Sequence, residues 1–241
     1  MTRRHGGTRP WGAVLVPVLA LVLVAVLFAG LGAWQLCRLE WKLALIAHTE
    51  AMAHAAPIDP VRLSAGSLAG ETYRRLTMTG HFRADAATLV AGMSGLGTGY
   101  WEMVPLLGDD GHAVLVNRGF LPEGSRIAAA RAAVPPGVVR VEGLLRQSEP
   151  GGAFLRANRP AEDRWYSRDV AAIAAHHGVA SDPRLFIDAF VETPATPVAA
   201  MQPTPGLTVI RFPNNHLGYA LTWFAMAVMA AGGAFVVGRR P

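Results

Sequence analysis

A histidine beside an apolar segment is the residue of this sequence best suited to bind a metal. His216 follows Asn214 and Asn215 and directly precedes an uncharged stretch, so we expect it at the mouth of a membrane helix. An imidazole in this position can ligate haem iron. Tyr219 and Trp223 follow at i+3 and i+7, on the same helix face one and two turns deeper. The pattern predicts a haem ligand above an aromatic wall.

A second stripe of this kind ends the first apolar segment of the chain. Trp34, Arg38 and Trp41 have i, i+4 and i+7 spacing, and we expect them at the same membrane depth as His216. Arg38 can meet the carboxylate of a haem propionate, and Arg211 is a second candidate for that role. Tryptophan and tyrosine are also enriched at membrane interfaces without any cofactor. An ordinary interfacial belt is therefore the alternative to a haem site.

The segment from Asn158 to Tyr166 combines mixed charges with two aromatic residues. Such a composition suits the polar rim around an anchored protein contact. We expect Arg159, Arg164, Trp165 and Tyr166 to bind a partner protein. The alternative is an internal network of arginine and acidic residues.

Other motifs favour no enzymatic chemistry. The glycine-rich residues 95–99 lead into a strand and lack the helix and Lys-Ser/Thr pair of a phosphate loop. The chain has no G-x-S-x-G nucleophile motif, and its single cysteine, Cys37, excludes an internal disulfide or a cysteine zinc site. His176 and His177 point about 100° apart on a helix, which fits helix-end electrostatics better than metal binding. We expect no catalytic residue.

Two stretches are long and apolar enough to cross a bilayer, which needs about 20 apolar residues in a helix. We place membrane helices at residues 11–36 and 216–238, where no side chain carries a formal charge. A cleaved signal peptide is the alternative for the first. Its apolar run exceeds the usual length of about 7 to 15 residues, and charged residues separate it from the A-x-A sequence at 53–55.

Basic residues flank both spans at the chain ends, which predicts that residues 1–10 and 239–241 lie in the cytoplasm. Residues 37–215 then form a periplasmic domain on a bacterial inner membrane. The pI of about 10.1 reflects in part this terminal charge, which orients the chain and meets anionic lipid. We expect a lipid bilayer and no nucleic acid as a partner.

The segment between the spans is long enough for one domain with its own core. Alternating, β-rich patterns predict strands at residues 73–82, 88–92, 100–107, 113–120, 138–145 and 185–191. Gly-Asp-Asp-Gly at 108–111 supplies a hairpin turn. One helix is expected at 168–177, with Ser167 as its N-cap. The predicted fold class is α+β: two transmembrane helices flank a mainly antiparallel sheet or small barrel.

Several short motifs occur in order along nearly the whole chain: Leu31-Gly32-Ala33-Trp34-Gln35-Leu36, Tyr73-Arg74-Arg75, Gly80-His81-Phe82, Val114 to Phe120 (VLVNRGF), Asn158-Arg159-Pro160, Trp165-Tyr166, Phe186-Ile187-Asp188 and Asn214 to Ala220 (NNHLGYA). Together they resemble the Surfeit-locus protein 1 family of cytochrome c oxidase assembly factors. The tryptophan usual after the Asn-Arg-Gly motif is Phe120 here.

The resemblance implies a two-span protein that aids assembly of a haem-copper oxidase. Its implied partners are the catalytic subunit and other oxidase assembly factors. Bacterial members are associated with haem a, and the histidine of the Asn-Asn-His motif, here His216, is the implied iron ligand. The alternative from another class is a scaffold that binds oxidase subunits through its soluble domain without haem.

Overall fold

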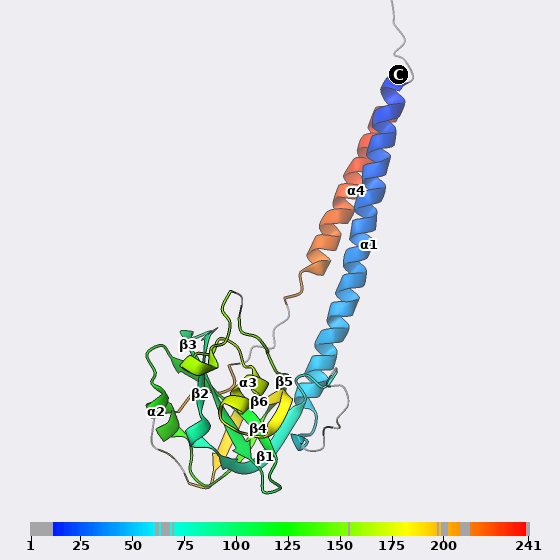
Figure 1. Cartoon of the computed structure of the whole chain (residues 1–241). Coiled ribbons are helices and arrows are strands. Elements are labelled where there is room, and N and C mark those ends of the chain that lie inside the picture. Colours follow the sequence, from blue (N-terminus) through cyan, green and yellow to red (C-terminus); the bar gives the residue numbers. More distant parts are fainter. Residues whose placement is uncertain are drawn as a thin grey trace, which may run out of the picture. The chain divides into compact units, whose positions relative to one another are not determined.

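The computed structural model describes residues 12–60, 63, 68, 70–153, 155–196, 198, 202–207 and 213–239 (Figure 1). The chain divides into two compact units. Residues 1–47 with 211–241 form the first unit, and residues 48–210 form the second.

Two helices build the first unit. Helix α1 (Gly12–His54) has 43 residues and contains Pro17, and α4 (His216–Gly238) has 23 residues. The bounds of α4 match the predicted span, whereas α1 continues well beyond residue 36. Both helices are long and apolar enough to span a bilayer, and little of their most apolar windows is buried: none in α1 and 17% in α4. A core helix of a soluble protein would be buried, so the two helices indicate membrane anchoring.

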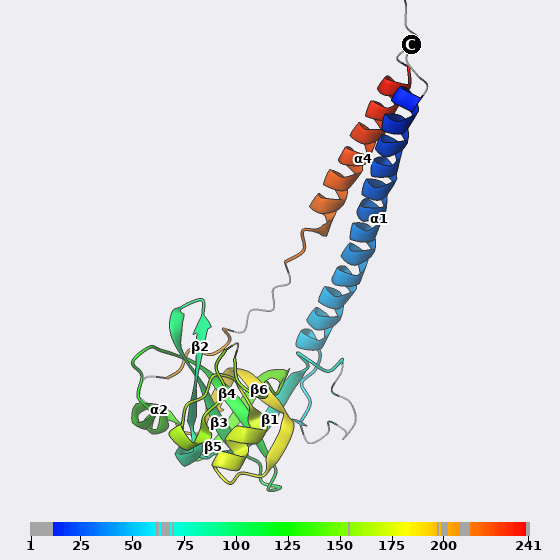
Figure 2. The same ribbon diagram turned by 45° about the horizontal axis from the view of Figure 1, so that its top comes forward.

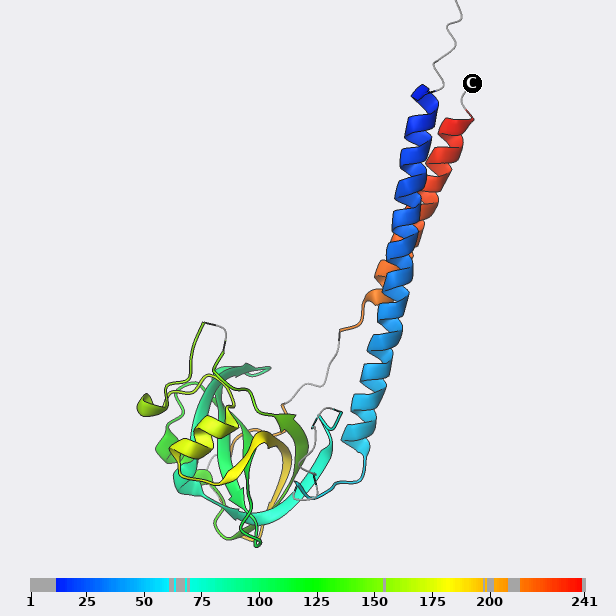
Figure 3. The same ribbon diagram turned by 45° about the vertical axis from the view of Figure 1, so that its right-hand side comes forward.

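The two helices pack side by side in all three views (Figures 1, 2 and 3). Their pairing is antiparallel, because His216 at the start of α4 contacts Gln35, and Gly238 at its end lies beside Val18. Gly32 makes the approach close: a Cβ atom there would lie 2.6 Å from the ring of Phe224. Small residues permit such close helix packing in membranes.

The second unit is built on one six-stranded sheet. Its strands have the order β1-β5-β6-β4-β3-β2, and β1 pairs in addition with β3. The strands are β1 (Arg75–Phe82), β2 (Thr88–Ser94), β3 (Gly97–Leu107), β4 (Ala113–Pro122), β5 (Val138–Gln147) and β6 (Ser181–Pro194). The β1–β3 pairing joins residues 81–82 to 106–107 and closes most of the sheet into a small barrel, with β2 left at its edge. The predicted α+β class is confirmed.

All strand pairs are antiparallel except β4 with β6. The predicted turn at 108–111 joins β3 to β4. Helix α2 (Ile127–Ala133) was not predicted, and the helix predicted at 168–177 is α3 (Val170–His176). Its N-cap is Asp169, which accepts a hydrogen bond from the Ala172 N–H, and not Ser167. The short 3-10 turns η2 (Ala84–Ala86) and η3 (Pro160–Glu162) complete the unit.

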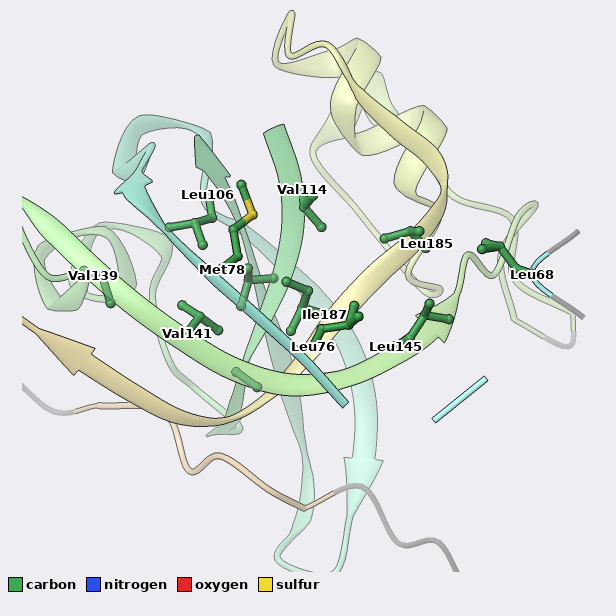
Figure 4. Close-up of a cluster of buried hydrophobic side chains, with 12 residues drawn as sticks. Leu68, Leu76, Met78, Leu106, Val114, Val139, Val141, Leu145, Leu185 and Ile187 are labelled. Carbon is green, nitrogen blue, oxygen red and sulfur yellow. The ribbon is translucent and has the colours of Figure 1, made fainter. Parts of the chain in front are cut away.

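The barrel interior is apolar. Side chains from β1, β3, β4, β5 and β6 meet in one cluster that includes Leu76, Met78, Val141, Leu145 and Ile187 (Figure 4). A second cluster lies beneath α3 and contains Trp165, Ile173 and Phe186. These two clusters hold the sheet and α3 together.

The Asn-Arg-Gly motif on β4 holds the segment that follows β6. Arg118 is buried, and its guanidinium contacts Glu102 and Glu192 at 2.9 Å and donates to the Gln202 side chain at 2.8 Å. Gly119 has φ +139°, and a Cβ atom there would lie 2.4 Å from the Thr204 carbonyl oxygen. Residues 202–206 are thereby bound onto the sheet, and β6 extends to Pro194, beyond the strand predicted at 185–191.

Candidate functional site

The residue predicted to bind a metal makes a specific contact within the helical hairpin. His216 is the first residue of α4, and its Nδ1 lies 2.7 Å from the Oε1 atom of Gln35 on α1. An amide oxygen accepts hydrogen bonds, so Nδ1 carries the ring hydrogen in this arrangement. The other ring nitrogen, Nε2, then keeps its lone pair. This is the tautomer in which a histidine ligates a metal, with its second nitrogen bonded to a carbonyl-type acceptor.

Aromatic residues follow this contact along α4, toward its C-terminal end. The ring centroids of Trp223 and Phe28 are 5.5 Å apart, so Trp223 packs against α1. Ala220, which is 1% exposed, also faces α1. Tyr219 is 57% exposed and lies outside this contact. Of the two aromatic residues predicted beneath His216, Trp223 packs against a ring of the neighbouring helix, whereas Tyr219 is largely exposed.

Only part of the first stripe lies level with His216, because the helices are antiparallel and the two stripes extend in opposite directions from the Gln35–His216 contact. Trp41 lies six residues beyond Gln35, about 9 Å toward the C-terminal end of α1. Trp223 lies seven residues beyond His216, about 10 Å in the opposite direction. Trp34, adjacent to Gln35, is the member of the first stripe level with His216, and it is 58% exposed.

Arg38 lies one turn beyond Trp34. Its guanidinium carbon is 4.0 Å from the centroid of the Trp41 ring, which is a cation–π contact. The side chain is exposed, so it can still reach an acidic group near His216. Arg211, the second residue considered for that role, lies outside the described residues.

Gln35 is the site residue that the sequence prediction missed. It stands in the Trp34-Gln35-Leu36 motif, where it had no assigned role. A polar amide in an apolar span is unfavourable unless it finds a partner, and this signal marks Gln35 as a residue with a specific contact.

The predicted partner-binding segment divides into a buried part and an exposed part. Trp165 is 1% exposed, and its Nε1–H donates to Asp163 at 2.9 Å, so its prediction as a partner contact is wrong. Asn158 fixes this segment, because its Oδ1 atom accepts the backbone N–H of Tyr166 at 2.8 Å. The segment keeps Trp165 inside through these local bonds, which composition alone does not reveal.

Arg159 and Arg164 are exposed. Their guanidinium groups lie 3.5 and 3.3 Å from the Glu162 carboxylate, so both face solvent as parts of one charged cluster. Tyr166 is partly buried, with the Arg156 guanidinium carbon 5.5 Å from its ring centroid. This surface remains available to a partner.

The histidine pair at the end of α3 has structural contacts. His177 Nε2 lies 2.8 Å from the Thr88 hydroxyl, and burial lowers the pKa of His177, which favours a neutral polar ring at this helix end. The His176 ring packs edge-on against Trp165, with centroids 5.7 Å apart. Within the described part of the chain, no three His, Cys, Asp or Glu side chains gather in a way that could hold a metal ion.

Two helices long and apolar enough to span a bilayer, one before and one after a small closed sheet in the sequence, suggest the class of membrane-anchored proteins with one sheet domain. The chain belongs to the SURF1 family, whose model matches residues 22–228. Members of this family are known as cytochrome oxidase assembly factors. The matched range includes both members of the Gln35–His216 contact, and the resemblance read from the motifs is confirmed.

Individual relatives agree with the family match. A "SURF1-like protein" of Monosiga brevicollis is 34% identical over 239 residues, which cover 94% of this chain and 86% of the relative. "Surfeit locus protein 1" of Mus musculus is 31% identical, over 90% of this chain and 71% of its own. A "SURF1-like protein" of Caenorhabditis elegans is 32% identical, over 87% and 70%. These relatives are eukaryotic and give no support to a bacterial inner membrane.

Proposed function

We propose that this family member binds haem a through His216 and aids its insertion into the catalytic subunit of cytochrome c oxidase. The supporting observation is the contact between His216 Nδ1 and Gln35 Oε1 at 2.7 Å. It holds the imidazole in one tautomer and one orientation, as partners of metal-ligating histidines do. A histidine serving only as an interfacial residue needs no such partner.

The neighbouring residues fit a haem with propionate groups. Bound haem would supply an iron that accepts a nitrogen ligand, and His216 would provide it. Trp223 offers an aromatic surface about two turns deeper than His216, and the exposed guanidinium of Arg38 suits a carboxylate. We also include Trp34 and Tyr219 in the proposed haem site, because both are exposed and lie next to the His216–Gln35 contact. We assign no chemical step to the protein: its residues bind, orient and release.

The test compares purified wild-type protein with His216→Ala, both isolated in detergent from cells that make haem a. We expect a haem absorption band in the wild type and its loss in His216→Ala. Leu43→Ala is the matched control, because Leu43 is exposed and lies eight residues beyond Gln35, about 12 Å along α1. Equal haem content in the wild type and His216→Ala would contradict the assignment of the ligand.

We further propose that both chain termini lie on the cytoplasmic side and the sheet domain on the periplasmic side of a bacterial inner membrane. The basic termini support this orientation, and the antiparallel hairpin brings the two chain ends to the same side. Cys37 is the single cysteine and is exposed. In a Cys37→Ser protein that carries Leu96→Cys, a membrane-impermeant maleimide should label intact spheroplasts. Labelling only after lysis would indicate the opposite orientation, with the sheet domain in the cytoplasm.

The second candidate function is a scaffold for oxidase subunits that does not use haem. The exposed Arg159–Glu162–Arg164 cluster favours it. Under this alternative, Arg164→Ala reduces oxidase assembly while His216→Ala leaves assembly intact. Trp165 substitutions do not discriminate between the haem and scaffold functions, because Trp165 is a core residue whose loss would destabilise the domain.

A further inference from the structure

Two tight turns of the sheet domain carry exposed leucines. The turn at residues 95–96 joins β2 to β3, and Leu96 within it is 64% exposed. The second turn is closed by two backbone hydrogen bonds between Ala153 and Arg156, at 2.9 and 3.0 Å, and its Leu155 is 88% exposed. We refer to Leu96 and Leu155 as the leucine tips.

Leucine is an unusual residue at these positions. Two-residue hairpin turns favour Gly, Asn and Asp. Leu155 has φ +63°, a left-handed conformation that is sterically unfavourable for a side chain of this size. The fold therefore holds a large apolar side chain in solvent despite a strained backbone. Strain of this kind, together with apolar exposure, is a feature of binding sites.

The two turns flank one groove. They lie at the same end of the domain (Figures 1 and 3), and the groove of about 970 Å³ is lined by Met93 and Tyr100 from the β2–β3 hairpin and by Ala153 and Arg156 from the second turn. Met93 is 73% exposed, which adds a third large apolar side chain. The leucine tips and Met93 thus form an apolar rim at this end of the domain.

The groove inside this rim carries charges of both signs. Carboxylates outnumber guanidinium groups in its lining: Glu123, Glu162 and Asp163 stand against Arg156 and Arg164. All three carboxylates belong to exposed residues. A purely anionic surface would meet net repulsion here. The headgroups of zwitterionic phospholipids instead offer ammonium groups to the carboxylates and phosphates to the guanidinium groups.

The apolar helices before and after the domain tether it close to a bilayer. Gly206, whose N–H donates to the Ala189 carbonyl oxygen on β6, lies ten residues before His216, and ten residues span at most about 35 Å. The bilayer is therefore present at a high effective concentration. Three apolar side chains suffice for a tethered contact with lipid, whereas a stable contact with a protein buries about 800 Å² of each partner.

We propose that the leucine tips and the groove between them bind the surface of a bilayer of zwitterionic phospholipids. Leu96, Leu155 and Met93 enter the boundary between headgroups and acyl chains, about 5 to 10 Å deep. The groove carboxylates face the ammonium groups of the headgroups, and Arg156 faces their phosphates. The inference rests on membrane anchoring by α1 and α4 and does not depend on haem binding.

The test uses the full-length Cys37→Ser protein in nanodiscs of phosphatidylcholine and phosphatidylethanolamine, with an environment-sensitive dye on one added cysteine. Leu155→Cys reports on a tip. Asp109→Cys is the matched control, because it lies in the turn at the other end of β3, an 11-residue strand about 35 Å long. We expect the dye at residue 155 to emit at shorter wavelength and to lose most of its emission to a nitroxide-labelled lipid. The dye at residue 109 should show neither change.

A second measurement tests whether the two tips act together. Leu96→Ser, introduced into the labelled Leu155→Cys protein, should reduce the quenching at residue 155. Val138→Ser should leave that quenching unchanged: Val138 is 42% exposed and pairs with His81, which also pairs with Leu107 at the far end of β3. Both substitutions replace an exposed apolar residue, so they differ in position and not in kind.

Lipid composition tests the role of the groove. Replacing part of the phospholipid by anionic phosphatidylglycerol should lower the quenching at residue 155, because fewer ammonium groups face the carboxylates. The haem content of Leu96→Ser should equal that of the wild type. A wild type without haem would therefore contradict the haem proposal and leave the lipid contact standing.

Four results would overturn the inference. The dye at residue 155 is quenched no more than the dye at residue 109. Leu96→Ser and Val138→Ser have the same effect. Quenching increases with phosphatidylglycerol. The dye at residue 155 becomes shielded only when oxidase subunits are added, which would assign the leucine tips to a protein partner.

Discussion

Replacing Gln35 by leucine should weaken haem binding by removing the acceptor that orients His216. Leucine has a similar size and no polar atom, so the perturbation is confined to the bond of 2.7 Å between Gln35 Oε1 and His216 Nδ1. Without that acceptor, the ring hydrogen can move to Nε2 and block the ligating nitrogen, and the ring can rotate. Loss of such a partner typically lowers metal affinity about 10- to 100-fold. This corresponds to about 1.4 to 2.7 kcal/mol.

The assay is a haem titration followed by absorption, in the wild type, Gln35→Leu and Gln35→Glu. The carboxylate of Gln35→Glu still accepts from Nδ1–H, so this variant should retain affinity close to the wild type, while Gln35→Leu loses it. A simple packing role for Gln35 would give the reverse order, since leucine suits an apolar helix better than glutamate. Equal affinity in the wild type and Gln35→Leu would refute the positioning role.

Three further predictions concern the hairpin and the sheet. Gly32→Val should push the Phe224 ring away, because a Cβ atom at residue 32 would lie 2.6 Å from that ring. The variant should have a lower haem affinity, and engineered cysteines on α1 and α4 should form fewer disulfides in it. An unchanged yield of the disulfide would contradict the close packing of the helices. Trp165→Ala should lower the unfolding free energy by about 3 to 5 kcal/mol, whereas the exposed control Arg164→Ala should change it by less than about 0.5 kcal/mol. Similar thermal midpoints in both variants would contradict the burial of Trp165. Burial raises the pKa of Glu102 from 4.5 to about 7, so the folded state holds a proton that the unfolded chain has lost. The stability supplied by this proton is complete below about pH 4.5, and on the order of 3 kcal/mol of unfolding free energy is lost as the pH rises to about 7. Denaturation curves of Glu102→Gln should show a weaker dependence of the unfolding free energy on pH across that range. A steeper dependence in Glu102→Gln would argue against the raised pKa.

The sequence predicted the elements of this protein better than their pairing. Helix α4 has the bounds predicted for the second apolar segment, because apolar length and the polar residues before His216 are local signals. Most strands and the turn at 108–111 also follow from local alternation. The parallel pairing of β4 with β6 joins residues about 70 positions apart, and no local pattern specifies it. Helix α2 was missed although its alanine-rich sequence favours a helix.

The candidate site was predicted residue by residue and not as an arrangement. Helical spacing placed Tyr219 and Trp223 relative to His216, and the predicted location of both termini implied antiparallel spans, but neither signal specified which residues of the two helices lie level. The antiparallel pairing separates Trp41 from Trp223, and it brings Gln35, a residue without an assigned role, to His216. Trp165 was misread for a similar reason, because its burial depends on α3 and β6 packing against it.

The haem content of the protein isolated from haem-a-producing cells is the most direct test of its central role. A wild-type protein with about one haem a per chain, together with Gln35→Glu close to it and His216→Ala without the band, is the expected result. A wild type that carries no haem under these conditions, or a His216→Ala protein that carries as much as the wild type, would contradict the proposed haem site.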